Sequence, residues 1–148
     1  MRILHTIVIM FIGSFIIQYL LMSTIMSNNI SNVTNSLGKV YLATIMGLYM
    51  VLIEIAMRDM QYGSFNVMYY SIFGGLLIIF IYFYRVQYAI KDRQYLEEMI
   101  EHHSMALLTS HEILKKTDSY NVSKLAKNII QTQTDEILEM RNLLKSVK

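Results

Sequence analysis

The stretch EEMIEHHSMA, residues 97–106, gathers the residue types of this chain that are best suited to binding a metal ion. Two adjacent histidines, His102 and His103, lie between Met99 and Met105, in a chain with 4 histidines and no cysteine. Imidazole and thioether without thiolate form a ligand set that suits copper, Cu(I) in particular. Carboxylates with imidazole would suit iron or manganese, but di-iron bundles use Glu-x-x-His pairs, and none occurs after residue 90. Copper is therefore the better chemical match.

The same residues also have a structural interpretation. Methionines on an apolar helix stripe more often fill the core than bind metal. A single histidine at a helix interface is more often a hydrogen-bonded structural residue, although an adjacent pair flanked by methionines is less easily explained in that way. The residues alone leave two hypotheses open, a metal site and a buried hydrogen-bond network that fixes helix register.

Two amphipathic helices are predicted to position these residues. The first carries its buried side chains at steps of three and four, the spacing of one helix face: Leu96, Met99, Ile100, His103, Leu107 and Leu114. Asp92 is expected to cap it, and TDSYN, residues 117–121, predicts a polar turn. The predicted stripe of the second helix is Val122, Leu125, Ile129, Gln133, Ile137, Met140 and Leu144. Together the two helices form an antiparallel hairpin.

Folding this hairpin at its turn brings distant residues to the same level. Met99 becomes level with Met140, and His103 becomes level with Asp135 and Glu136, one turn from Gln133. Thioether, imidazole, amide and carboxylate groups therefore meet. Because two helices cannot enclose a core, we expect the hairpin to pair with another, most simply in a homodimeric four-helix bundle.

The first 90 residues have a different character, because they hold only 6 of the 24 charged residues of the chain. Apolar runs at Ile3 to Met26, about 40–57 and about 67–84 each approach the roughly 20 residues that cross a bilayer. The first run is too long for a signal peptide and lacks a small-x-small cleavage site, so we expect a retained anchor. The sequence thus predicts an all-α, multi-pass integral membrane protein, with a transmembrane region over residues 1–90 and a hairpin domain over residues 91–148.

The second span carries four methionines on one arc, with an acid at its border: Met46, Met50, Met57, Met60 and Glu54. A methionine stripe in a membrane can pass Cu(I) between thioethers, or it can be adaptable packing surface, which is the commoner case. An ionisable residue near the end of a span is a functional candidate by default.

Charge restricts the other function classes. Residues 91–148 hold 9 basic and 9 acidic side chains, so no basic surface for nucleic acid is expected. No nucleophile–base motif, phosphate loop or cofactor fingerprint occurs, so the protein is not expected to be an enzyme. For orientation, Arg2 and Arg58 favour a cytoplasmic N-terminus, whereas the more numerous Lys39, Arg85, Lys91 and Arg93 favour a cytoplasmic tail.

The segments QYLEEMIEHHSMALLTS and KLAKNIIQTQTDEILEMRNLL resemble the domain of unknown function numbered 305, a ferritin-like helical family. The matching positions, over about residues 92–146, are Met99, His102, His103, Ala106, Leu125, Ala126, Ile129, Ile130, Gln133, Glu136, Ile137 and Met140. The preceding part, with YMVLIEIAMRDMQY and YRVQYAIKDRQYL, is similar to the membrane-anchored branch of that family, which has three spans.

The resemblance implies copper binding in metal homeostasis, as buffering or handover, on the extracytoplasmic side. Carried over to this chain, the implied ligands are Met99, His102, His103 and Met140, with Gln133 and Glu136 as further ligands or as residues that orient an imidazole. Two positions depart from the family pattern. Glu101 stands where the family often has proline, and Thr109 stands where it often has methionine. The alternative from the residues is a metal-free membrane scaffold whose hairpin mediates oligomerisation.

Overall fold

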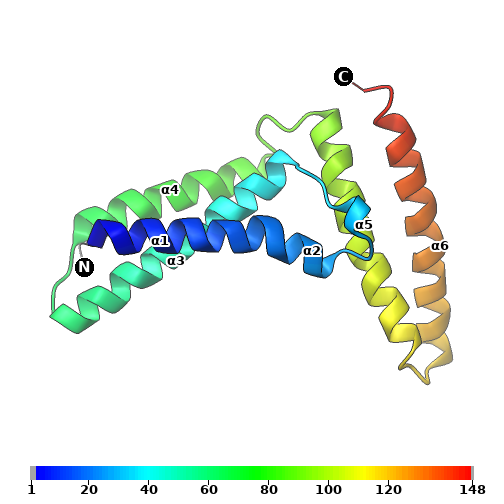
Figure 1. The fold of residues 1–148 in the computed structure, drawn as a ribbon, viewed down its shortest axis with the longest axis horizontal. Coiled ribbons are helices and arrows are strands. Elements are labelled where there is room, and N and C mark those ends of the chain that lie inside the picture. Colours follow the sequence, from blue (N-terminus) through cyan, green and yellow to red (C-terminus); the bar gives the residue numbers. More distant parts are fainter. Residues whose placement is uncertain (1–2, 148) are drawn as a thin grey trace. The chain divides into compact units, whose positions relative to one another are not determined.

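The computed structural model describes residues 3–147, which are helical and contain no strand (Figure 1). In chain order the elements are α1 (Ile3–Ile16), the π-helical η1 (Ile17–Met22), α2 (Ser23–Met26), the 3-10 turn η2 (Ile30–Asn32), α3 (Leu37–Tyr62), α4 (Val67–Arg85), α5 (Asp92–Leu114) and α6 (Tyr120–Leu143). The predicted all-α class is confirmed. Arg2, used in the charge count, lies outside the described residues.

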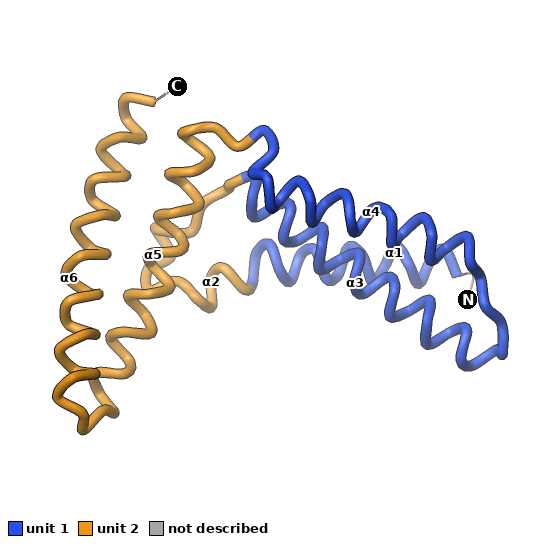
Figure 2. The backbone as a smooth tube through the Cα atoms, turned by 180° about the vertical axis from the view of Figure 1, so that it is seen from behind, with its two compact units in different colours: residues 1–21, 37–89 blue, residues 22–36, 90–148 orange. Residues whose placement is uncertain are grey.

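The described residues form two compact units (Figure 2). Unit 1 contains the chain up to Leu21 together with Leu37–Ala89, and unit 2 contains Met22–Ser36 together with the chain from Ile90. The segment between the first two apolar helices therefore belongs to the unit of the C-terminal hairpin.

Within residues 3–147, three helices are long and apolar enough to cross a membrane. They are Ile3–Met26, which is continuous through α1, η1 and α2, then α3 and α4, with mean hydropathies of 2.0, 2.0 and 1.8. Helix α3 extends past the predicted span of about 40–57, because residues 58–62 are also helical. The turn begins at Gly63, whose φ of 60° suits glycine, and Asp59 accepts hydrogen bonds from the Ser64 hydroxyl and the Asn66 amide.

Helix α3 is the central helix of unit 1 and packs against both α1 and α4. Ile7 of α1 meets Val51 and Ile55 in one buried cluster, and Leu48 meets Leu77 of α4 in another. Gly47 allows close approach to α1, because a Cβ there would lie 2.8 Å from the Phe11 ring and 3.2 Å from the Phe11 carbonyl oxygen.

Helix α4 ends without glycine or proline, in a turn in which two residues adopt left-handed backbone conformations. Gln87 and Ala89 have φ of 52° and 56°, a region that costs a residue with a side chain about 1–2 kcal/mol. Two contacts stabilise this turn. The Tyr41 hydroxyl of α3 donates to the Tyr88 carbonyl oxygen at 2.9 Å, and the Tyr88 ring stacks on Phe83.

Helices α5 and α6 form the predicted antiparallel hairpin in unit 2. Their shared core contains Leu96, Ile100, Leu107, Ile137 and Met140. Ser119 caps α6, since its hydroxyl accepts from the Val122 amide. Asp92, by contrast, is the first helical residue of α5 and not its cap, which is Lys91.

The inward face of α6 differs from the predicted stripe near the turn. Leu125 is 59% exposed and Val122 is 41% exposed, whereas Ala126 is buried. Ile130 packs against the hairpin core there, whereas Ile137, Met140 and Leu144 of the predicted stripe lie in or against that core. The predicted burial of Leu125 and Val122 was therefore wrong.

Candidate metal site

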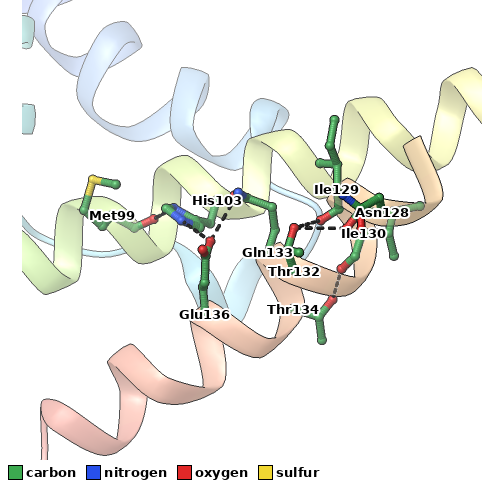
Figure 3. Close-up of polar contacts among 9 residues, drawn as sticks. All are labelled: Met99, His103, Asn128, Ile129, Ile130, Thr132, Gln133, Thr134 and Glu136. Atoms are coloured by element: carbon green, nitrogen blue, oxygen red, sulfur yellow. Dashed lines mark hydrogen bonds and ion pairs between the residues drawn. The ribbon is translucent and has the colours of Figure 1, made fainter. Parts of the chain in front are cut away.

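His103 is fixed by its own helix. Its side chain is 12% exposed, and Nδ1 lies 2.7 Å from the carbonyl oxygen of Met99, one turn earlier (Figure 3). A carbonyl oxygen can only accept a hydrogen bond, so Nδ1 carries the proton. This contact determines the orientation of the ring and directs Nε2 toward α6.

Glu136 of α6 meets that second nitrogen. The His103 Nε2 to Glu136 Oε2 distance is 2.9 Å, and the Gln133 amide nitrogen donates to the same oxygen at 3.3 Å (Figure 3). The contact joins the two helices at the level that the antiparallel register predicts. The Glu136 side chain is 51% exposed, so solvent screening limits the stabilisation from this contact to about 1 kcal/mol or less.

Both nitrogens of the His103 ring thus face acceptors. An imidazolium, which donates from both nitrogens, satisfies both contacts. A ring that has lost its Nε2 proton would direct a lone pair at the carboxylate, unless a cation lay between them. The position between Nε2 and the Glu136 carboxylate therefore suits a cation.

The two methionines lie one turn from this pair. Met140 follows Glu136 by four residues and is buried in the hairpin core, and Met99 precedes His103 by four residues and packs against the same core. The Met99 thioether points away from the Glu136 carboxylate in Figure 3. Both sulfurs therefore serve as core side chains in this structure.

His102 lies apart from His103, because neighbouring helix residues are separated by about 100°. Its side chain is exposed, and the two ring centroids are 6.3 Å apart at an interplanar angle of 68°. Over residues 3–147, no three His, Asp or Glu side chains are grouped to hold a metal ion. The structure thus brings His103, Gln133 and Glu136 together and leaves His102 outside that group.

The donors nonetheless fit a soft cation in their chemistry. A metal-binding histidine commonly donates its other N–H to a backbone carbonyl, as His103 does to Met99. Thioethers lie one turn away on both helices, and thioether with imidazole suits Cu(I). The fit requires that Nε2 exchange its contact with Glu136 for the ion.

Glu98, one turn before His102, carries the unusual electrostatics of α5. One of its carboxylate oxygens is buried without a hydrogen-bond partner among the described residues. Burial raises the pKa of the Glu98 carboxyl, and the neighbouring Glu101 carboxylate raises it further. Ionisation of Glu98 next to the Glu101 carboxylate is therefore unfavourable.

A polar contact that sequence reasoning missed joins the Met22–Ser36 segment to α5. Ser104 is fully buried, and its hydroxyl oxygen accepts from the Asn28 amide at 3.0 Å and from the Asn32 side chain at 3.1 Å. Glu101, also buried, accepts from the Thr34 amide at 2.8 Å. The signal was the small serine directly after the histidine pair, which allows the segment to approach the helix.

Arg141 fastens the same segment to α6. Its guanidinium donates to the Ser31 carbonyl and hydroxyl oxygens at 3.2 Å each, and to the Asn32 side-chain oxygen. The segment therefore contacts both helices of the hairpin, on the side reached by Ser104 and Arg141.

The described residues thus form three apolar helices, each long enough to cross a membrane, followed by a helical hairpin with a His–Glu contact. The chain belongs to the family described as domain of unknown function (DUF305), whose profile matches residues 85–146. It is 34% identical over 143 residues to "Uncharacterized protein L153" of Acanthamoeba polyphaga mimivirus, across 96% of this chain and 93% of that protein. No solved structure matches the chain. The family predicted from the His-His and Glu-Ile-x-x-Met segments is confirmed.

Proposed function

We propose that this chain is an integral membrane protein, anchored by its three apolar helices, whose α5–α6 hairpin binds Cu(I) for buffering or handover. The observation that carries the proposal is the Met99 carbonyl contact of His103. It keeps the proton on Nδ1 and leaves Nε2 as the nitrogen that can bind a metal, the arrangement usual for ligating histidines.

The proposed ligands are His103, Met99 and Met140, with His102 completing the set. Met99 and Met140 lie one turn from the His103–Glu136 contact, on α5 and α6 respectively. A change of side-chain rotamer can turn an unbranched thioether toward the imidazole, because methionine has three rotatable bonds. Gln133 and Glu136 would then orient the imidazole or bind the ion themselves.

The contact with Glu136 suits reversible binding better than permanent storage. A cation that binds Nε2 must replace its contact with Glu136, and departure of the cation restores a His103–Glu136 contact that is already formed in the structure. Binding and release therefore exchange one satisfied arrangement for another. That property favours metal handover over catalysis.

The hairpin is proposed to lie outside the cytoplasm, as the family resemblance implies. The contacts of residues 28–34 with α5 support a topology in which the loop after the first span and the hairpin share one side of the bilayer. The chain has no cysteine, so an Asn121→Cys variant gives a single label site on exposed α6. We expect a membrane-impermeant maleimide to label it in intact cells, and labelling only after lysis would place the tail inside.

A second candidate function is a metal-free membrane scaffold. It is favoured by the fact that His103, Glu136 and Gln133 already satisfy one another across the two helices. In that case the polar group fixes helix register. His103→Ala would then loosen the hairpin of the metal-free protein as much as it does in the presence of copper.

Copper content and Cu(I) affinity of the purified full-length protein test the proposal. The His102→Ala/His103→Ala double variant should lose binding by 100-fold or more while its helical circular dichroism is kept. His111→Ala is the matched control, because His111 is exposed and lies at the end of α5. Undiminished binding by the double variant would refute the copper assignment.

A further inference from the structure

The hairpin presents two matching rows of exposed side chains. On α5 the row contains Tyr95, His102 and Ile113, separated by seven and eleven residues, and Tyr95 and Ile113 are 53% and 40% exposed. On α6 the row is Leu125, Glu136 and Leu143, separated by eleven and seven residues, and Leu125 and Leu143 are 59% and 45% exposed. Steps of seven and eleven keep side chains on one helix face.

The two rows run level with each other. The His103–Glu136 contact sets the antiparallel register, and by it Tyr95 lies within about one residue of the level of Leu143, as do His102 with Glu136 and Ile113 with Leu125. The combined surface, which we call the open face, is thus apolar at both ends and carries one His and one Glu in the middle. Scattered apolar residues on a surface are common, but two rows in register are not random scatter.

The opposite side of the hairpin is already covered. There the Met22–Ser36 segment contacts Ser104, Glu101 and Arg141. On α5 the covered positions and the open-face row are separated by more than a right angle of helix rotation. The open face therefore lies on the side of the hairpin away from that segment.

We propose that the open face binds a second copy of this chain, about a two-fold axis parallel to the helices, so that α5 of each copy lies on α6 of the other. Each residue then faces residues of the other copy that lie at the same position along the helix axis. Tyr95 meets Leu143, Ile113 meets Leu125, and His102 meets Glu136, each contact occurring twice because a two-fold interface is self-complementary.

Charge complementarity favours a two-fold axis parallel to the helices over one perpendicular to them. Glu136 uses one oxygen for His103 of its own chain, and a carboxylate has capacity for further donors, so it can also accept from His102 of the other copy. With the two-fold axis perpendicular to the helices, His102 would instead face Ala106, and Glu136 would face Thr132, leaving both without a charged partner. A second copy also supplies apolar rows of the same length at the same levels. This dimer does not depend on metal binding.

A charge exchange between two full-length chains in detergent, with metal chelator present, tests the proposal. His102→Glu alone places two acids opposite each other twice, and Glu136→Lys alone places a cation against His102 twice. Each variant should therefore be monomeric, with self-association at least 10-fold weaker than that of the unaltered chain. Mixed together with different affinity tags, the two should pair, because every contact is then complementary.

The pairing of two variants that cannot dimerise alone shows that both are folded, so loss of fold is not an explanation for their separate behaviour. Leu125→Gln should also weaken the dimer. Leu138→Gln should not, because Leu138 is 56% exposed but lies beside Asn28 and Arg141, away from the open face. A monomeric unaltered chain, or variants that fail to pair in the mixture, would overturn the proposal.

Discussion

Replacement of Asn32 by alanine should selectively loosen the C-terminal hairpin, although Asn32 lies in the loop between the first two apolar helices. Its side chain is 6% exposed and joins both hairpin helices, donating to the Ser104 hydroxyl and accepting from Arg141. The substitution removes both hydrogen bonds at a buried position, where water does not readily replace them.

The magnitude follows from the two bonds. A neutral bond to a buried hydroxyl contributes about 1 kcal/mol, and Ser104 keeps the Asn28 amide as a donor. The hydrogen bond from Arg141 is charge-assisted, but Arg141 is exposed and still donates to two oxygens of Ser31 in the variant. Loss of this bond therefore also costs about 1 kcal/mol. The expected loss is therefore about 2 kcal/mol.

Hydrogen–deuterium exchange of the full-length protein in detergent measures this loss where it occurs. Because each 1.4 kcal/mol corresponds to a factor of ten, amides of Ile100–Leu107 should exchange about 30-fold faster in Asn32→Ala. Amides of α4 serve as the internal reference. Asn29→Ala is the control and should change exchange by less than about fivefold, because Asn29 is exposed. Equal effects of the two substitutions would refute the view that this loop is part of the hairpin unit.

Two further predictions concern burial. The pKa of Glu98 is raised in the folded protein. Its contribution to the free energy of unfolding is therefore stabilising below the ordinary carboxyl pKa, and it is lost as the pH rises through the pKa of the folded protein. Glu98→Gln should therefore stabilise the protein at neutral pH and flatten this part of the pH dependence in thermal unfolding; a larger pH dependence would contradict it. Gly47→Ala should destabilise by about 1–3 kcal/mol through contact with Phe11, whereas Gly13→Ala, with open space around its Cβ, should be neutral or slightly stabilising in the same melts.

The helices were predictable because their signals are local. Apolar length identified three helices able to cross a membrane, and steps of three and four residues identified the hairpin. The antiparallel register also followed from the turn, which is why His103 was expected, and is found, level with Glu136. The all-α class and the family were both within reach of the sequence.

The missing parts depend on non-local contacts. Nothing in the loop Ser27–Ser36 indicates that Asn32 and Thr34 bind residues about seventy positions later, since the loop is merely polar and uncharged. The turn after α4 has no glycine, so left-handed Gln87 and Ala89 had no local signal and depend on Tyr41 from α3. The burial of Ala126 in place of Leu125 depends on packing against α5.

For the candidate site, the sequence predicted which residues lie close together but not which hydrogen bonds they form. The meeting of His103, Gln133 and Glu136 followed from the register, but the Met99 carbonyl as partner of Nδ1 did not, because it is a main-chain acceptor. The separation of His102 from His103 follows from the angle of about 100° between neighbouring helix residues, but the exposure of the His102 ring does not. Copper binding and the ligand set stay predictions.

X-ray absorption at the copper edge, on full-length protein loaded with one equivalent of Cu(I), tests the central claim most directly. We predict mixed nitrogen and sulfur scattering, with the nitrogen contribution reduced in His103→Ala and unchanged in His111→Ala. Failure of the intact protein to retain Cu(I), or a spectrum without sulfur that is indifferent to His103, would contradict it.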